Sequence, residues 1–191
     1  MRISRVALAI ACLIVLASQQ DTARASTFVA LSLEGLVTNA DTVVIGEAVD
    51  VRTHRDARGA IVRSVTFRVD EYVVGGGLDK LTIRLLGGVL DGMARKVPGE
   101  ISLPIGASTM LFLGKSPDET SDSYLVVGMP QGRFNIIRDN TTGERFATRT
   151  LGNLNLVGDP GDDPFGLAKP HTSNFILLAD FIAVIREIAD R

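Results

Sequence analysis

Three successive stretches of alternating apolar and polar side chains, residues 43–52, 61–73 and 81–85, constrain the fold of this chain more than any other feature. A period of two places the apolar residues on one face of a β-strand. In the second stretch, one parity is held by Ile61, Val65, Phe67, Val69 and Val73. In the first stretch Glu47 has the parity of the apolar residues. Either Gly46 forms a β-bulge that resets the register, or a carboxylate lies at the edge of the core.

Further strands and turns follow. The polar segment 54–60 predicts a hairpin loop, and Gly75-Gly76-Gly77 and Gly87-Gly88 end the second and third stretches. Glycine and proline punctuate residues 89–107, which we expect to be mostly loop. Short apolar strands are predicted at 110–114, buried on both faces, and at 123–128. A second hairpin is predicted from 133–139 and 144–149, around the turn DNTTGE.

Helices are predicted near both ends of this β-rich region. Ser32 is a candidate cap for a short helix over residues 32–37. A C-terminal amphipathic helix over 172–190, capped by Thr172 or Ser173, presents an apolar face that we expect to pack on the sheet. Between hairpin and helix, residues 150–171 form a long loop rich in Gly, Asp and Pro.

These elements predict a mainly β fold, either a single antiparallel OB-like barrel or a small sandwich. The barrel would span 41–149, with the short N-terminal helix before it and the C-terminal helix packed on it. Short strands with glycine-rich breaks are typical of both architectures.

Residues 1–25 have the order of a secretory signal peptide. Arg2 and Arg5 precede an apolar run at 6–17, and Ala23-Arg24-Ala25 supplies a small-x-small cleavage site. The run is shorter than the ~20 residues that span a bilayer. We therefore expect cleavage after Ala25 and a single mature domain, 26–191, without a transmembrane segment. Ala9-Ile10-Ala11-Cys12 resembles a bacterial lipobox, which leaves lipidation at Cys12 as a second processing route.

Cleavage would remove Cys12, the one cysteine in the sequence, so the mature protein would hold no disulfide and no thiol. A disulfide-free exported domain fits a bacterial periplasmic or extracellular protein. The formal net charge is −2 for the whole chain and −4 after residue 25, and no basic run exceeds two residues. This balance argues against nucleic acid or anionic lipid as the main partner.

Part of the chain resembles the OB-like barrel of netrin-like and tissue-inhibitor-of-metalloproteinase domains. The similar segments are ADTVVIGEAVDVR, VTFRVDEYVVGG, LTIRLLGG and PIGASTMLFLG, within residues 40–115. The same arrangement is similar to uncharacterised exported bacterial proteins. The resemblance implies a barrel and a protein-binding role. It does not carry over the family's zinc-chelating N-terminal cysteine, because the expected mature chain starts at Ser26.

No residue pattern assigns a catalytic, cofactor or metal site. The two histidines, His54 and His171, are expected on the surface, and no G-x-S-x-G or H-E-x-x-H motif occurs. Asp159, Asp162 and Asp163 share one loop that is a weak calcium candidate, and residues 139–144 are expected to be a plain turn. The carboxylates of Glu34, Glu47, Asp70 and Glu71 could act as acid and base only if the fold paired them.

The expected function is an exported, non-catalytic module that binds a protein or a cell-envelope partner. Long loops on a rigid barrel carry recognition, so we expect the contact surface at 86–107 or 150–171. The alternative is a secreted enzyme or a hydrolase-accessory protein, and a third class is a structural protein of the envelope.

Overall fold

The computed structural model describes residues 27–117, 122–151, 154–159, 161, 164–165, 167 and 175–191. The expectations for residues 1–25, Cys12, Asp162, Asp163, His171, Thr172 and Ser173 lie outside this part of the chain. The described elements are β1 (Thr27–Val29), α2 (Leu33–Thr38), β2 (Thr42–Arg55), β3 (Ile61–Val74), β4 (Lys80–Leu86), β5 (Gly88–Leu90), β6 (Met93–Arg95), β7 (Ser108–Lys115), β8 (Tyr124–Val126), η1 (Met129–Gly132), β9 (Arg133–Arg138), β10 (Arg145–Thr148), β11 (Asn155–Val157), β12 (Phe175–Leu177) and α3 (Leu178–Ala189).

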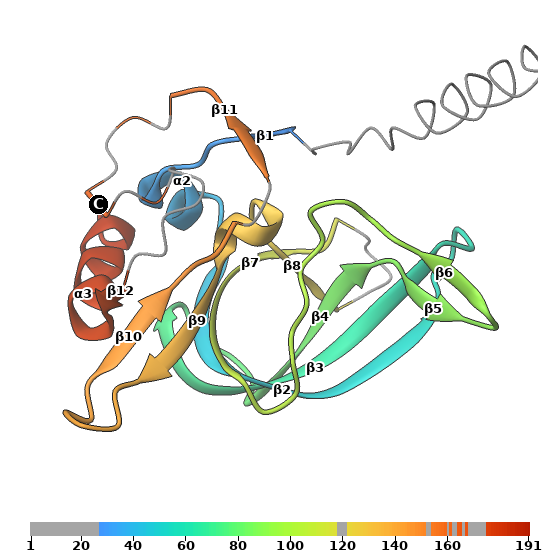
Figure 1. Cartoon of the computed structure of the whole chain (residues 1–191), viewed down its shortest axis with the longest axis horizontal. Helices are drawn as coiled ribbons and strands as arrows, with labels where there is room; N and C mark the ends of the chain where they lie inside the picture. The colour runs from blue at the N-terminus through green and yellow to red at the C-terminus, as the bar shows by residue number, and fades with distance from the viewer. Residues whose placement is uncertain are drawn as a thin grey trace, which may run out of the picture.

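The main feature is an eight-stranded mixed sheet that forms a partial ring (Figure 1). Its strand order is β12-β10-β9-β7-β2-β3-β4-β8, and β8 also pairs with β7. The prediction of a mainly β fold with a short N-terminal helix and a packed C-terminal helix is confirmed.

The prediction of a purely antiparallel sheet is wrong at one position. β8 pairs antiparallel with β7 and parallel with β4, through Ile83 and Tyr124. The reason is geometric. The strands β2, β3, β4, β8 and β7 return on themselves. Because five is odd, strand directions cannot alternate around the whole circuit, and one neighbouring pair must run in the same direction.

Two apolar cores lie on opposite faces of the strands. The inner core is made of Val44, Ala48, Val65, Phe67, Leu81, Ile83, Leu85, Ile101, Leu103, Leu111 and Leu113. The outer core joins β2, β7 and β9 to both helices through residues that include Phe112, Phe134 and Phe181. As predicted for residues 110–114, the side chains of Met110, Leu111, Phe112 and Leu113 are fully buried, because β7 separates the two cores.

The β2–β3 register shifts between Ile45 and Gly46, but the extra residue is Asp70 on β3, so the prediction that Gly46 resets the register of β2 is wrong. A Cβ on Gly46 would lie 2.0 Å from the carbonyl oxygen of Arg68, so only glycine fits there. Alternation in β2 continues through Gly46, so Glu47 keeps the parity of Ile45, which faces the outer core. This matches the second expectation, a carboxylate at the edge of the core, and that carboxylate lies 2.7 Å from the guanidinium of Arg68.

The start of α2 agrees with the prediction, and the start of α3 does not. The predicted cap of α2 is confirmed, since Ser32 Oγ accepts a hydrogen bond of 3.0 Å from the Gly35 amide. The helix expected over 172–190 exists, but it begins only at Leu178. Residues 175–177 instead form β12 on the edge of β10, where Ile176 is buried opposite Ala147. Apolar side chains in a strand that leads directly into a helix extend the helical pattern and mask the boundary.

The expected loop 150–171 also contains regular structure. Residues 155–157 form β11, which pairs in parallel with β1 near the start of the described chain. Gln131 fixes the neighbouring backbone, because its side-chain amide accepts from the Leu31 N–H and donates to the Val29 carbonyl.

No helix within the described ranges combines the length and the apolar character needed to cross a bilayer.

The outer core predicts a large difference between two phenylalanines. Phe134 is fully buried, with its ring centroid 4.9 Å from that of Phe181, whereas Phe175 is 64% exposed. Phe134→Ala should lower the free energy of unfolding by about 3–5 kcal/mol because it leaves a cavity. Phe175→Ala should change it by about 0.5 kcal/mol or less. Chemical denaturation of both variants measures this, and equal losses would contradict the assignment of the core.

Candidate binding site: a projecting hairpin

The β5–β6 hairpin stands out from the ring at the end where β2 and β3 turn (Figure 1). Its two strands pair Gly88 with Arg95, Val89 with Ala94 and Leu90 with Met93. Residues 96–107 hold no named helix or strand, as expected for a region that is mostly loop, but the hairpin before them was not predicted. Asp91 and Gly92 both have positive φ, 52° and 74°, as a type I′ two-residue turn requires. The Asp-Gly pair between apolar residues was the sequence signal for this hairpin.

The hairpin exposes an unusual amount of apolar surface. Val89 is 67% exposed and Met93 50%, and Ala94 is also exposed. Asp91 in the turn is the one charged residue between positions 88 and 94. A two-stranded hairpin of this size buries too little surface to be stable alone. The paired conformation of the hairpin therefore depends on the contacts at its base.

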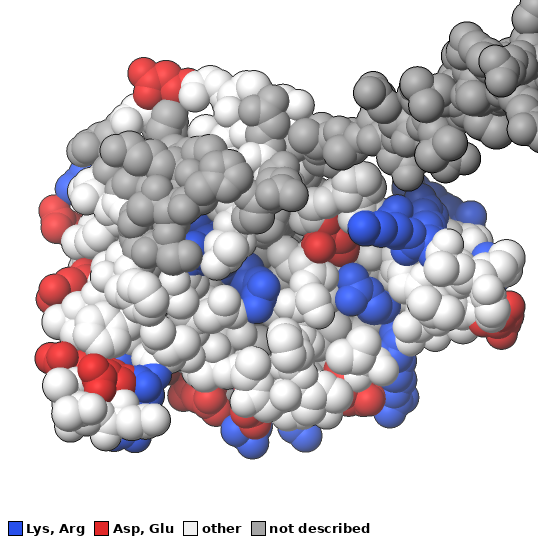
Figure 2. Space-filling model, in the orientation of Figure 1, with Lys and Arg blue, Asp and Glu red and all other residues white. Residues whose placement is uncertain are grey.

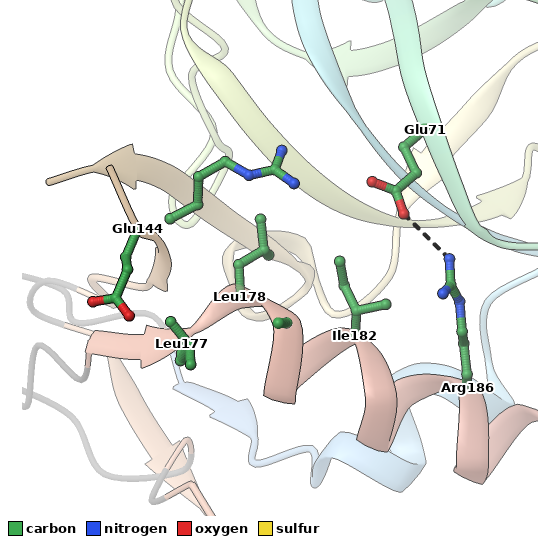
Figure 3. Close-up of a pocket in the computed structure, with 8 residues that line it drawn as sticks. Glu71, Glu144, Leu177, Leu178, Ile182 and Arg186 are labelled. Carbon is green, nitrogen blue, oxygen red and sulfur yellow. Dashed lines mark hydrogen bonds and ion pairs between the residues drawn. The ribbon is translucent and has the colours of Figure 1, made fainter. Parts of the chain in front are cut away.

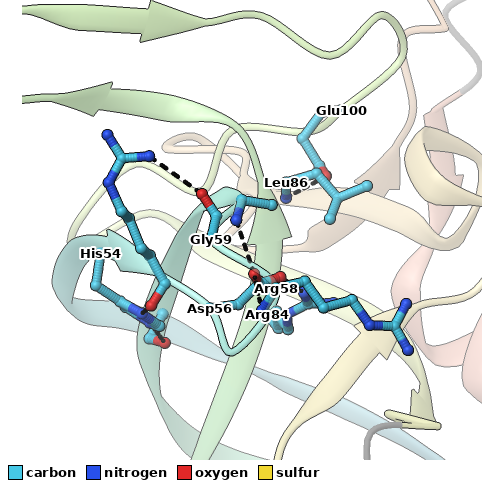
Figure 4. Close-up of polar contacts among 10 residues, drawn as sticks. His54, Asp56, Arg58, Gly59, Arg84, Leu86 and Glu100 are labelled. Atoms are coloured by element: carbon cyan, nitrogen blue, oxygen red, sulfur yellow. Dashed lines mark hydrogen bonds and ion pairs between the residues drawn. The ribbon is translucent and has the colours of Figure 1, made fainter.

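Glycines and polar side chains hold that base, and Figure 4 shows one of the contacts, between Glu100 and Leu86. The Gly87 amide donates to the Ile61 carbonyl at 2.9 Å. A Cβ on Gly87 would lie 2.3 Å from the Arg95 carbonyl oxygen, so the two ends of the hairpin meet where only glycine fits. The Glu100 carboxylate accepts the amides of Leu86, at 2.5 Å, and Ile101, at 3.0 Å.

Arg63 of β3 completes the closure. Its guanidinium donates to the carbonyls of Leu86, at 3.4 Å, and Ile101, at 3.2 Å. Arg63 and Glu100 thus join the chain just before the hairpin to the chain just after it. Ile101 and Leu103 then enter the inner core, which anchors the return segment in the ring. The hairpin therefore extends from a base that is closed by hydrogen bonds.

The turn between β2 and β3 is ordered beside this base. Asp56 accepts the amides of Ala60, at 2.8 Å, and Arg58, at 3.0 Å, and pairs with Arg84 at 2.5 Å (Figure 4). The hydrogen bond from the Ala60 amide is the largest cause of a lowered pKa of the Asp56 carboxyl, and Arg58 and Arg84 act in the same direction. The loop predicted at 54–60 is thereby confirmed as a tight turn.

A second surface feature is an open groove of about 500 Å³ between α3 and the neighbouring strands (Figure 3). Leu177, Leu178 and Ile182 contribute apolar side chains to it. The charged groups lining it are Glu71, Glu144, Arg145 and Arg186, with Glu71 and Arg186 paired at 3.2 Å. Two acids and two bases balance one another, so the groove favours neither sign of charge.

A third surface lies on the outer face of β9, β10 and β12. Ile137 and Leu177 flank Phe146 from the two neighbouring strands, and Phe175 lies close by. Ile137 is 39% exposed and Phe146 is half-buried. This face continues the body of the sheet and does not project from it, in contrast to the β5–β6 hairpin.

The carboxylates considered as an acid–base pair are not combined in one site. Glu47 and Asp70 lie on either side of Arg68, at 2.7 and 3.4 Å from its guanidinium. Glu71 pairs with Arg186 at the groove, and Glu34 is exposed in the first turn of α2. Exposed ion pairs of this kind contribute little to stability.

His54 is exposed, as predicted, and contacts Ser64 across the β2–β3 ladder. Its Nδ1 lies 3.0 Å from the Arg55 carbonyl oxygen, and its Nε2 lies 2.7 Å from Ser64 Oγ. A carbonyl only accepts, so Nδ1 carries the hydrogen, and in the neutral ring Nε2 accepts from the serine hydroxyl. The contact resembles the Ser–His pair of nucleophilic enzymes, but a backbone carbonyl stands in the place of the usual carboxylate.

Oxygen-rich loops provide no metal site in the described part of the chain. No group of three or more His, Cys, Asp or Glu side chains there is placed to hold a metal ion. Asp159 accepts the Gly161 amide at 3.0 Å, as in an ordinary turn. Residues 139–144 also form a turn, in which Asp139 accepts the amides of Thr141 and Thr142 and its pKa is lowered by them.

Comparison of the chain with protein-family models, with curated proteins and with solved structures finds no match in any of the three. The resemblance to netrin-like domains over residues 40–115 therefore stays a prediction.

Proposed function

We propose that this protein is an exported, non-catalytic binding module that contacts a protein or cell-envelope partner through the β5–β6 hairpin. The observation that carries the proposal is the exposure of Val89 and Met93 on a projection whose base is closed by Arg63 and Glu100. Exposed apolar surface costs solubility, so a prominent apolar projection marks an interaction site. Holding the projection in place before binding reduces the entropy lost on binding.

We further propose that the ring is an OB-like barrel. The five strands pair in the order first, second, third, fifth, fourth and back to the first, when β2, β3, β4, β7 and β8 are counted along the chain. The inner core fills its interior. In this description the hairpin belongs to the connection between the third and fourth strands, the region 86–107 that was expected to carry recognition.

Export rests on residues 1–25, whose positive start, apolar run and small-x-small site are those of a signal peptide. Periplasmic or extracellular localisation agrees with a fold whose strands are held by apolar cores and hydrogen bonds, since Cys12 is the one cysteine in the sequence.

The binding proposal predicts position-specific cross-linking. A photoreactive side chain at Val89 should form a discrete adduct with a component of the exported fraction or the envelope. The same group at Leu78 should not, although Leu78 is equally exposed, at 68%, because it lies in the β3–β4 turn at the other end of β3. Gel mobility and mass spectrometry of the adducts measure this. Absence of an adduct at Val89, or equal adducts at both positions, would contradict the proposal.

The second candidate function is that of a secreted hydrolase or a hydrolase-accessory protein, and the contact between His54 and Ser64 is the observation that favours it. If this pair is catalytic, the protein should hydrolyse activated esters, and both His54→Ala and Ser64→Ala should reduce turnover by at least about 100-fold. Thr66→Ala, on the next outward position of β3, is the matched control. Turnover that survives both substitutions would rule out this pair as the site.

A further inference from the structure

We infer that the β5–β6 hairpin docks on an anionic lipid surface. The inference rests on the proposed function and names the partner of the same hairpin. Three features support it: the apolar character of both hairpin faces, the positive charge collected around the hairpin base, and the fixed connection between them.

The hairpin is apolar on both of its faces. Its cross-strand pairs put Val89 beside Ala94 on one face and Leu90 beside Met93 on the other. A groove on a folded partner usually covers one face of a hairpin and leaves the other in water. A lipid interface surrounds whatever enters it, so apolar side chains on both faces gain from leaving water.

Positive charge gathers at the base of the hairpin from separate segments of the chain. The turn and strand segment 50–63 and the segment 84–101 together carry seven Arg or Lys and four Asp or Glu, a net charge of +3 in a chain whose total is −2. The exposed cations Arg58, Arg95 and Lys96 make no ion pair within the described residues. They are available to an external anion.

Figure 2 shows how these charged and apolar residues are arranged on the surface. The β5–β6 hairpin forms a largely uncharged lobe, and Lys and Arg side chains gather on the body next to it. Apolar side chains next to a cluster of cations are the arrangement that peripheral membrane proteins use on anionic bilayers. The sequence argued against anionic lipid because it contains no basic run. Folding instead brings cations together from positions 52–63 and 84–96.

The base of the hairpin gives this surface a defined orientation. Gly88 lies against Thr53 and Arg63, where a Cβ would come within 2.9 Å of the Thr53 methyl group. The hairpin base is thus packed against β2 and β3 beside their turn, so the apolar lobe and the nearby cations can meet a planar surface together. Asp91 at the tip opposes entry into hydrocarbon, so the hairpin rests at headgroup depth, where water and headgroups can also pair with its open strand edges.

Vesicle binding tests the inference with the processed chain recovered from the exported fraction. Vesicles of phosphatidylglycerol and phosphatidylcholine in equal parts should bind the protein, and vesicles of phosphatidylcholine alone should bind it much more weakly. The double substitution Val89→Ser with Met93→Ser should weaken binding by at least about tenfold. Replacing Arg95 and Lys96 by Gln should weaken it by about fivefold per cation. Leu78→Ser, far from the hairpin, should leave binding unchanged.

Fluorescence provides an independent measurement because the chain contains no tryptophan. The indole introduced by Val89→Trp should shift to shorter wavelength when anionic vesicles are added, and that introduced by Leu78→Trp should not. The shift reports contact with lipid even if the serine variants fold poorly.

Two outcomes would overturn the lipid inference. One is the absence of binding to anionic vesicles together with an unshifted indole at position 89. The other is binding that is indifferent to the hairpin substitutions. If a photoreactive group at Val89 nevertheless captures a protein, the inference fails and the proposed binding function stands. If Val89 captures neither protein nor lipid, both fail.

Discussion

The fold depends on the closure of five strands around one apolar interior. β8 makes this closure by pairing with both β4 and β7, and the parallel β4–β8 contact is the consequence of an odd number of strands. The position of β8 between β4 and β7 covers part of the edge that β4 would otherwise expose. Closure also gives β2 and β7 a core on each side, so the ring, the two helices and the β9–β10–β12 extension form one connected structure.

The hairpin depends on this ring. Ile101 and Leu103 enter the inner core, and Arg63 and Glu100 tie the chain at Leu86 to the chain at Ile101. An eight-residue hairpin that buries so little of its own surface would not hold its form without that base. The same contacts that stabilise the base leave the apolar side chains of the hairpin in solvent. The structure therefore combines a stable interior with an apolar projection that no described residue covers.

Local patterns predicted much of this fold. The alternation in β3, the buried run of β7, the turn at 139–144 and the Ser32 cap each depend on neighbouring residues, which the sequence shows directly. The parallel β4–β8 contact depends on how many strands close the ring, and β12 is hidden by the apolar pattern of α3. The hairpin was encoded by Leu90-Asp91-Gly92-Met93. Its base could not be predicted, because Arg63 and Ile101 are separated by 38 residues in the sequence.

The central claim is that the β5–β6 hairpin is formed and fixed in the free protein, before any partner binds. Nuclear Overhauser effects in the isolated protein test this claim most directly. The structure predicts cross-strand contacts between Val89 and Ala94 and between Leu90 and Met93, with backbone order close to that of β3. Random-coil shifts and fast motion over residues 88–95, with no cross-strand contacts, would contradict it.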